Sequence, residues 1–180
     1  MSNKLDILTN LFVESSYREF NLREIARLTG LNPMTASKYL GRLEKEGVIR
    51  KKPERNYIFY SANTESITFR DLKKYHNVRK LRSSGLVDYI EKELGYPQAI
   101  VLFGSYSKAE NNRESDIDLF ILSESKKKLD LSGYMSKLGA EIQIFRHSRI
   151  EFEEMKAKNK ELLNNILNGT VLNGFLEVFK

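Results

Sequence analysis

The sequence predicts an α/β (α+β) fold with a small mixed sheet in its C-terminal half, preceded by a helical domain that ends in a β-hairpin. In the C-terminal half, apolar runs of strand length lie at residues 99–103 and within residues 115–122, with helical patterns around them. In the N-terminal half, three short helical patterns precede two short runs typical of strands. The 180 residues leave room for one or two small domains.

Composition excludes several classes of chemistry. Hydrophobic residues make up 41% of the chain, which is enough for ordinary globular cores. The chain has no cysteine, so disulfides, thiolate zinc sites and cysteine nucleophiles are excluded. His76 and His147 are the only histidines, which excludes a histidine-rich metal site. No apolar run approaches the length of a membrane span, and we expect a cytoplasmic protein with no membrane partner.

Charge divides unevenly along the chain. Residues 1–80 hold 16 Lys and Arg against 9 Asp and Glu, whereas residues 81–180 hold 14 against 15. The basic half predicts an acidic partner, and nucleic acid is the commonest one.

The first three helical patterns have recognisable limits. Apolar stripes cover residues 3–14 and 22–28, and Gly30 stops the second of them. The third pattern begins at Asn32-Pro33, because asparagine caps helices and proline is favoured at the first helical position. It runs to about residue 46.

A basic hairpin follows these helices. Residues 48–52 and 57–60 are typical of strands, and residues 53–56 predict the turn between them. Three short helices followed by a basic hairpin resemble the winged helix-turn-helix domain of bacterial and archaeal regulators, over roughly residues 3–62. The resemblance implies that the helix from Pro33 enters the major groove of DNA.

The resemblance implies two groups of DNA contacts. The side chains nearest to base edges would be Met34, Thr35, Ser37 and Lys38. The cations expected at phosphates or in a minor groove are Arg42, Arg50, Lys51, Lys52 and Arg55. The alternative is that the basic loop is only solvated and the winged domain docks another protein. Because winged-helix proteins often bind palindromes as dimers, we expect a homodimer.

A connecting helix is predicted between the two halves. The expected division is a winged domain over residues 1–65, a connecting helix over 66–83 and a second domain over 84–180. The cations expected to extend the basic surface along this helix are Arg70, Lys73, Lys74, Arg79 and Lys80.

The strongest chemical signal is a carboxylate pair that follows a Gly-Ser turn. Asp116 and Asp118 are two residues apart at a predicted strand, so both point from one face. Like charges repel, and such a pair is retained at low cost only if a cation lies between them. Oxygen ligands without thiol or imidazole favour Mg²⁺ or Mn²⁺. Upstream, Gly104-Ser105 ends a buried strand, where backbone N–H groups can bind phosphate.

A third acid lies on another predicted strand, over residues 139–145. Glu141 and Gln143 would share one face of this strand. If the strand pairs with the one that carries Asp116, Glu141 completes a cluster of three carboxylates. Such a cluster can hold two divalent ions ~3.5–4 Å apart, the spacing used for in-line nucleotidyl displacement.

Gly104-Ser105, ten further residues and then Asp116-x-Asp118 resemble the signature of the DNA polymerase beta-type nucleotidyltransferase superfamily, and most closely its minimal nucleotidyltransferases. The similarity covers roughly residues 84–176. It implies that Asp116 and Asp118 bind Mg²⁺, and that Glu141 activates the acceptor hydroxyl and shares a metal. Nucleotide phosphates would be held by Gly104, Ser105 and Lys108.

Two departures from the family pattern are visible. Ala109 stands where the family often has glycine, and the third acid is Glu141 rather than the commoner aspartate.

The resemblance implies transfer of a nucleoside monophosphate from a triphosphate to a hydroxyl, coupled to DNA binding. The acceptor would be a protein hydroxyl, as in minimal nucleotidyltransferase antitoxins that modify a partner toxin, or a small molecule. The alternative is a transcription regulator whose nucleotidyltransferase-like domain only senses a nucleotide.

Overall fold

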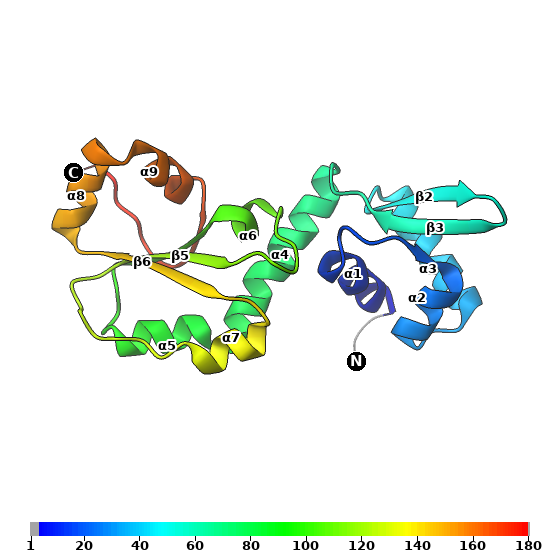
Figure 1. Ribbon diagram of the computed structural model, residues 1–180, viewed down its shortest axis with the longest axis horizontal. Helices are drawn as coiled ribbons and strands as arrows, with labels where there is room; N and C mark the ends of the chain where they lie inside the picture. The colour runs from blue at the N-terminus through cyan, green and yellow to red at the C-terminus, as the bar shows by residue number, and fades with distance from the viewer. Residues whose placement is uncertain (1–3, 180) are drawn as a thin grey trace. The chain divides into compact units, whose positions relative to one another are not determined.

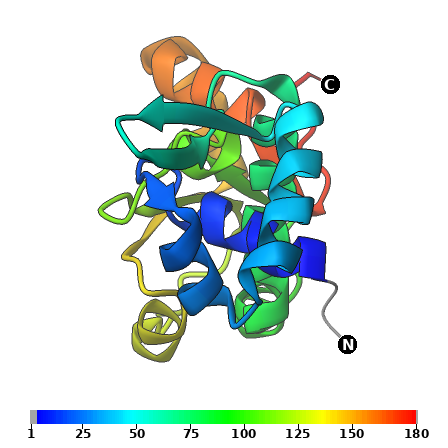
Figure 2. The ribbon, with the colours of Figure 1, turned by 90° about the vertical axis from the view of Figure 1, so that its right-hand side faces the viewer.

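The computed structural model describes residues 4–179 and forms two compact units that divide between His76 and Asn77. The predicted fold class is confirmed, because three short helices and a hairpin precede an α/β unit with a small mixed sheet. The first unit contains the elements α1 (Lys4–Glu14), β1 (Phe20–Asn21), α2 (Leu22–Thr29), α3 (Pro33–Lys45), β2 (Ile49–Glu54) and β3 (Tyr57–Ala62). Figure 2 shows this unit with its helices and its hairpin facing the viewer. The predicted helix start at residue 3 lies outside the described residues.

Side-chain caps define α2 and α3. The Asn21 side chain accepts a hydrogen bond from the backbone N–H of Glu24. Asn32 accepts one from the backbone N–H of Thr35 over 2.8 Å, and Pro33 is the first residue of α3. These contacts confirm the cap predicted at Asn32-Pro33, because each satisfies an N–H that lacks a partner within the helix.

The hairpin differs from its prediction in two respects. Its strands extend further, since β2 continues through Pro53 and Glu54 and only two residues form the turn. Proline is tolerated there because β2 is an edge strand in the order β1-β3-β2. The two-residue strand β1, which pairs with β3, was not predicted.

A single helix, α4 (Ile67–Ser84), spans the range expected to connect the domains. Its early turns contribute Phe69, fully buried, to the core of the first unit. The expectation that Lys73 belongs to a basic surface is wrong, because this side chain is 1% exposed and its ammonium lies 5.5 Å from the centre of the Tyr17 ring. The helix ends before Gly85, which has φ +83.

The second unit is built on a mixed sheet. Its elements are α5 (Leu86–Glu93), β4 (Ala99–Phe103), α6 (Gly104–Lys108), β5 (Ile117–Leu122), α7 (Ser132–Leu138), β6 (Ile142–His147), α8 (Arg149–Lys158), α9 (Lys160–Leu167) and β7 (Thr170–Gly174). The strand order is β6-β5-β4-β7, with β5 and β6 parallel and the other pairs antiparallel. Helices α5 and α7 lie on one face of the sheet, and α8 and α9 lie on the other (Figure 1).

Alternation along β5 separates the two faces. Ile117, Leu119 and Ile121 belong to the core shared with α5 and α7. Phe120 and Leu122 belong to the core under α8 and α9. Asp118 lies on this second face by its position, at the open end of a strand that is otherwise buried.

One strand boundary differs from its predicted position. The strand expected from residue 139 begins at Ile142, after helix α7 has ended at Leu138. Strand β7 lies near the end of the region of family resemblance and pairs with β4. Within the described residues, none of the helices combines the length and the apolar character that crossing a membrane requires.

Candidate functional site

The Asp118 carboxylate lies directly against the turn that follows β4. Phe103, the last residue of β4, pairs with Asp118 in the antiparallel register, and Gly104 follows with φ +68. A Cβ atom added to Gly104 would lie 2.2 Å from Asp118 Oδ2. Glycine is therefore favoured at position 104 both for its backbone conformation and for the close approach of the carboxylate.

Asp116 and Asp118 are electrostatically coupled. Burial raises the pKa of Asp118 above its ordinary value of 3.8, and the negative charge of Asp116 raises it further. Gln143, from the neighbouring strand β6, donates a hydrogen bond from Nε2 to Asp116 Oδ2 over 2.5 Å. The structure thus brings the two aspartates together, and the amide of Gln143 orients one of them.

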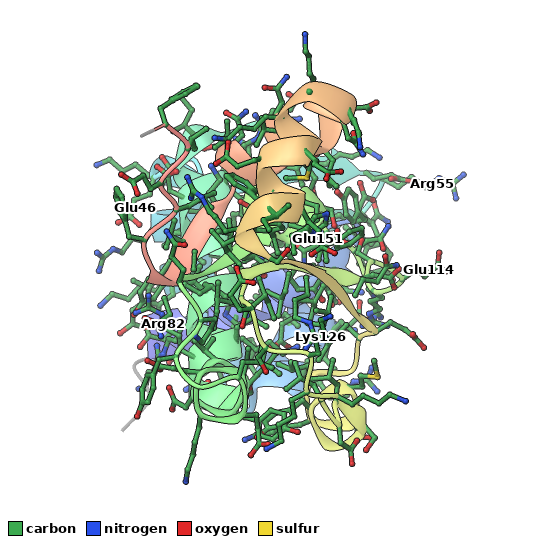
Figure 3. The ribbon with its side chains drawn as sticks, turned by 90° about the vertical axis from the view of Figure 1, so that its left-hand side faces the viewer. Glu46, Arg55, Arg82, Glu114, Lys126 and Glu151 are labelled. Carbon is green, nitrogen blue, oxygen red and sulfur yellow. The ribbon has the colours of Figure 1, made fainter. Side chains whose placement is uncertain are left out.

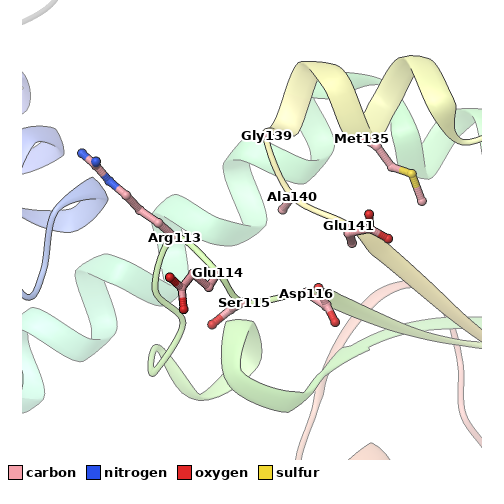
Figure 4. Close-up of a pocket in the computed structure, with 8 residues that line it drawn as sticks. All are labelled: Arg113, Glu114, Ser115, Asp116, Met135, Gly139, Ala140 and Glu141. Atoms are coloured by element: carbon pink, nitrogen blue, oxygen red, sulfur yellow. The ribbon is translucent and has the colours of Figure 1, made fainter.

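The backbone of Glu141 lies close to the two aspartates, whereas its carboxylate does not point toward them. Its carbonyl oxygen accepts a hydrogen bond from the N–H of Ile117 over 2.8 Å, just before β5 and β6 pair in parallel. The Glu141 side chain is exposed, and Figure 4 shows its carboxylate directed away from that of Asp116. Across residues 4–179 there is no group of three His, Cys, Asp or Glu side chains that could hold a metal ion. The predicted convergence of three carboxylates is not present in this arrangement.

The Gly-Ser segment forms the short helix α6. Ser105 is half-buried, and its carbonyl oxygen accepts the N–H groups of Ala109 and Glu110. Lys108 is exposed, and its Nζ lies 3.4 Å from Asn165 Oδ1. Ala109 has φ +61, the left-handed conformation that favours glycine, which gives a physical reason why glycine is the commoner residue at this position.

A pocket of about 370 Å³ opens beside Asp116 (Figure 4). One wall is residues 113–116, and the other is Met135 with residues 139–141. The pocket therefore joins the segment that leads to the aspartates with the segment that leads to Glu141.

Sequence reasoning missed two residues behind this site. Asn77 is 3% exposed and donates hydrogen bonds from Nδ2 to the carbonyl oxygen of Tyr106 and to Asn111 Oδ1. Burial raises the pKa of Tyr106, and the charge of Asp116 adds to the effect, whereas a hydrogen bond with Asn111 lowers it. The sequence does not indicate this role of Asn77, because an asparagine within a helix is recognised as a bridging residue only from its tertiary contacts.

The surface of α3 carries the predicted base-contacting side chains. Met34, Ser37 and Lys38 are exposed, whereas Thr35 is half-buried. Arg42 is exposed and bonded to Glu46 over 2.8 Å, which raises the pKa of Arg42 through that hydrogen bond and the charge of Glu46.

The hairpin cations differ in their partners. Arg50 pairs with Glu65, and Lys52 lies 3.4 Å from Glu54 and 3.7 Å from Glu19. The Arg55 side chain projects outward from the hairpin turn (Figure 3). Within the described part of the chain, no acidic group lies within ion-pair distance of the remaining cations Lys38, Lys51 and Arg55.

Comparison with known families agrees with this architecture. The model of the polymerase beta nucleotidyltransferase family matches residues 85–174, half of the chain, and the chain belongs to this family. A winged helix-turn-helix DNA-binding model matches residues 21–50. No match was found among curated proteins.

Likenesses to solved structures are weak. A ZitR variant from Lactococcus lactis has a TM-score of 0.37 and 12% identity, over 48% of this chain and 59% of that chain. RV1404 from Mycobacterium tuberculosis has a TM-score of 0.36 and 21% identity, over 49% of this chain and 57% of that one. Sso10a-2, a DNA-binding protein from Sulfolobus solfataricus, has a TM-score of 0.36 and 18% identity, over 51% and 96% respectively. With such low TM-scores these likenesses support no functional conclusion.

Proposed function

We propose that this chain is a divalent-metal-dependent nucleotidyltransferase whose winged domain binds DNA. The single observation that carries the proposal is the Asp118 carboxylate seated against Gly104, with Asp116 beside it. This contact joins the two parts of the family signature in space. The working division of the chain is a winged domain over residues 1–65, a connecting helix over 66–83 and a catalytic domain over 84–180.

The two aspartates fit a divalent cation. Their oxygens are hard ligands, and the raised pKa of Asp118 reflects its burial and then the negative charge of Asp116, both of which a bound cation would offset. Mg²⁺ or Mn²⁺ held by Asp116 and Asp118 would neutralise charge on triphosphate oxygens. Glu141 joins them as a ligand only if its exposed side chain rotates toward Asp116.

The proposed reaction is an in-line displacement. The acceptor oxygen attacks the α-phosphorus, and the bond from that phosphorus to the bridging oxygen breaks, so pyrophosphate leaves with the electron pair. The acceptor proton passes to the Glu141 carboxylate. Gly104, Ser105 and Lys108 hold the phosphates, since backbone amides and a lysine ammonium both favour anions.

Label transfer tests the enzyme proposal. The chain is incubated with each labelled nucleoside triphosphate, Mg²⁺ and candidate acceptors, including proteins from neighbouring genes and small alcohols. We expect transfer that Asp118→Asn abolishes, while Asp88→Asn, an exposed aspartate of α5, serves as the matched control. Transfer retained in Asp118→Asn would contradict the assigned role.

The second candidate is a nucleotide sensor that regulates transcription. It is favoured by the orientation of Glu141 away from the aspartates and by alanine at position 109. Calorimetry with Mg²⁺ and nucleotide separates the two functions, because a sensor binds nucleotide but transfers no label to any acceptor.

DNA binding is proposed from the exposed cations of α3 and the hairpin. Lys38 and Arg42 on α3 and Lys51 and Arg55 on the hairpin are exposed, with Arg50 and Lys52 available once their ion pairs open. Thr35 and Ser37 are proposed to contact bases. A gel shift at several salt concentrations tests this, since phosphate contacts weaken as salt rises. Light scattering tests the proposed homodimer.

A further inference from the structure

One face of α4 is bonded to residues that shortly precede each wall of the pocket beside Asp116. The first wall, residues 113–116, follows Asn111 by two residues. The second wall, residues 139–141, follows Leu138, the last residue of α7. Bonds from α4 reach both Asn111 and Leu138.

Asn77 holds the first wall together with the Gly-Ser helix. Its Nδ2 donates to the Tyr106 carbonyl oxygen over 2.8 Å and to Asn111 Oδ1 over 2.9 Å. Tyr106 directly follows Ser105. One buried amide group therefore fixes both the proposed phosphate-binding segment and the start of the loop that leads to Asp116. Because the bond to the Tyr106 carbonyl oxygen is buried, loss of the Asn77 donor would cost the free energy of a buried hydrogen bond.

Lys80 holds the second wall from the next turn of α4. Its Nζ donates to the Leu138 carbonyl oxygen over 2.9 Å, at the C-terminal end of α7, where a cation is favoured by the helix dipole. Asn77 and Lys80 are three residues apart and thus lie on one face of the helix.

We propose that Asn77 and Lys80 are positioning residues that set the separation of the pocket walls, and hence the placement of an acceptor hydroxyl between Asp116 and Glu141. This proposal rests on the proposed nucleotidyl transfer for its functional meaning. Its structural part stands independently of catalysis, because the hydrogen bonds from Asn77 and Lys80 are made within the protein whether or not a nucleotide is transferred.

Amide hydrogen exchange of the full chain tests the structural part. Asn77→Leu is expected to speed exchange in residues 111–117 and Lys80→Leu in residues 139–142, each by about five- to tenfold, as expected for loss of one hydrogen bond. Arg79→Leu, an exposed cation of the same helix, is the matched control and should change neither wall. Unchanged exchange in both walls, or equal acceleration at the core residue Ile121, would overturn the proposal.

A methyl probe in the pocket tests the functional part. Met135 lines the second wall, and its ¹³C-labelled methyl resonance is assigned with Met135→Leu. With Mn²⁺ as the probe, we expect this resonance to broaden in the wild type. The extent of broadening should differ in Lys80→Leu. It should return to the wild-type extent in Lys80→Arg, because arginine keeps a hydrogen-bond donor and a positive charge. Equal broadening in Lys80→Leu and the wild type contradicts a positioning role. Absence of broadening even in the wild type counts against the proposed metal site, while the exchange experiment still decides whether α4 holds the walls.

Discussion

At the scale of single residues, the site combines two unfavourable arrangements. Asp118 is partly buried beside another carboxylate, and Gly104 adopts a left-handed conformation at a spot with no room for a side chain. Strained or destabilised groups commonly lie where a protein has a function to perform. Each arrangement has a measurable consequence.

Gly104→Ala is expected to destabilise the second unit by about 1–3 kcal/mol, because the new Cβ would overlap Asp118 Oδ2 and alanine disfavours φ +68. Chemical denaturation measures this. Gly133→Ala is the matched control, since Gly133 lies within α7 and a Cβ there meets no atom within 4 Å. A stability of Gly104→Ala equal to that of the wild type would show that the carboxylate moves aside at no cost.

Asp118→Asn is expected to raise stability at pH 7 while removing transfer activity. Because the folded-state pKa of Asp118 lies above 3.8, the folded state binds the proton more tightly than the unfolded state does. The stabilisation that protonated Asp118 contributes is therefore fully present below pH 3.8. It is lost as the pH rises through the folded-state pKa of Asp118. The gain is at most about 1 kcal/mol, since solvent screens a group that is only partly buried. Thermal unfolding at pH 3.5 and pH 7 should show the gain only at the higher pH.

Some of these residue-level features could be predicted and others could not. The alternation of a strand predicts that Asp116 and Asp118 share a face. In the structure Asp116 lies just before β5, and its charge is close enough to Asp118 to raise the pKa of that carboxyl. The direction of the Glu141 carboxylate could not be predicted, because an exposed side chain with three rotatable bonds is not fixed by its backbone. The burial of Lys73 could not be predicted from the sequence either, because lysine is almost never fully buried.

At the scale of elements, α4 contains an unusual buried cation. Burial lowers the pKa of Lys73 to about 8, from an ordinary value of 10.5. The charged form is thus disfavoured in the folded state. The face of the Tyr17 ring provides partial compensation.

The stability of the first unit is expected to rise with pH. Below pH 8 both states of Lys73 are protonated and the folded state bears the full penalty, whereas between pH 8 and 10.5 the folded state loses its proton first and the penalty falls. The gain between pH 7.5 and 9.5 is roughly 1–2 kcal/mol. Denaturation curves of Lys73→Met should lack this gain, and Lys74→Met, an exposed neighbour, should keep it. An identical pH dependence in both variants would contradict the assignment.

Element types were easier to predict than their limits. The strong cap at Asn32 with Pro33 predicted the start of α3, and Ser148 with Glu151 forms a capping box at the start of α8. The two-residue strand β1 has no sequence pattern of its own, because it exists only through pairing with β3. Pro53 suggested a turn, although an edge strand can include it.

At the scale of the whole molecule, charge is divided between the two halves of the chain. The basic half contains the winged helix-turn-helix, and the nearly neutral half contains the acidic pair. Within the hairpin, cations that are bonded to acids differ from those that are not, so their contributions to DNA affinity should differ too.

Replacing Lys51 and Arg55 by glutamine is expected to weaken DNA binding and to reduce its salt dependence. Each lost phosphate contact lowers the slope of log affinity against log salt by about 0.9, so the double variant should lose a slope of about 1.8. Fluorescence anisotropy at several salt concentrations measures this. Lys92→Gln, an exposed cation of α5 that is assigned no DNA contact, is the control. An unchanged slope in the double variant would favour protein docking as the role of the winged domain.

Pro53 has a further effect because it lies on an outer strand. An exposed strand edge is a template on which a second chain can add its own strand, the route by which β proteins aggregate. A proline without an N–H group, between flanking Lys51, Lys52 and Glu54, interrupts that template with a missing donor and a row of charges. Edge-to-edge pairing of this hairpin with the hairpin of another copy is thereby disfavoured. This would hold even at the high local concentrations that neighbouring binding sites on one nucleic acid would create.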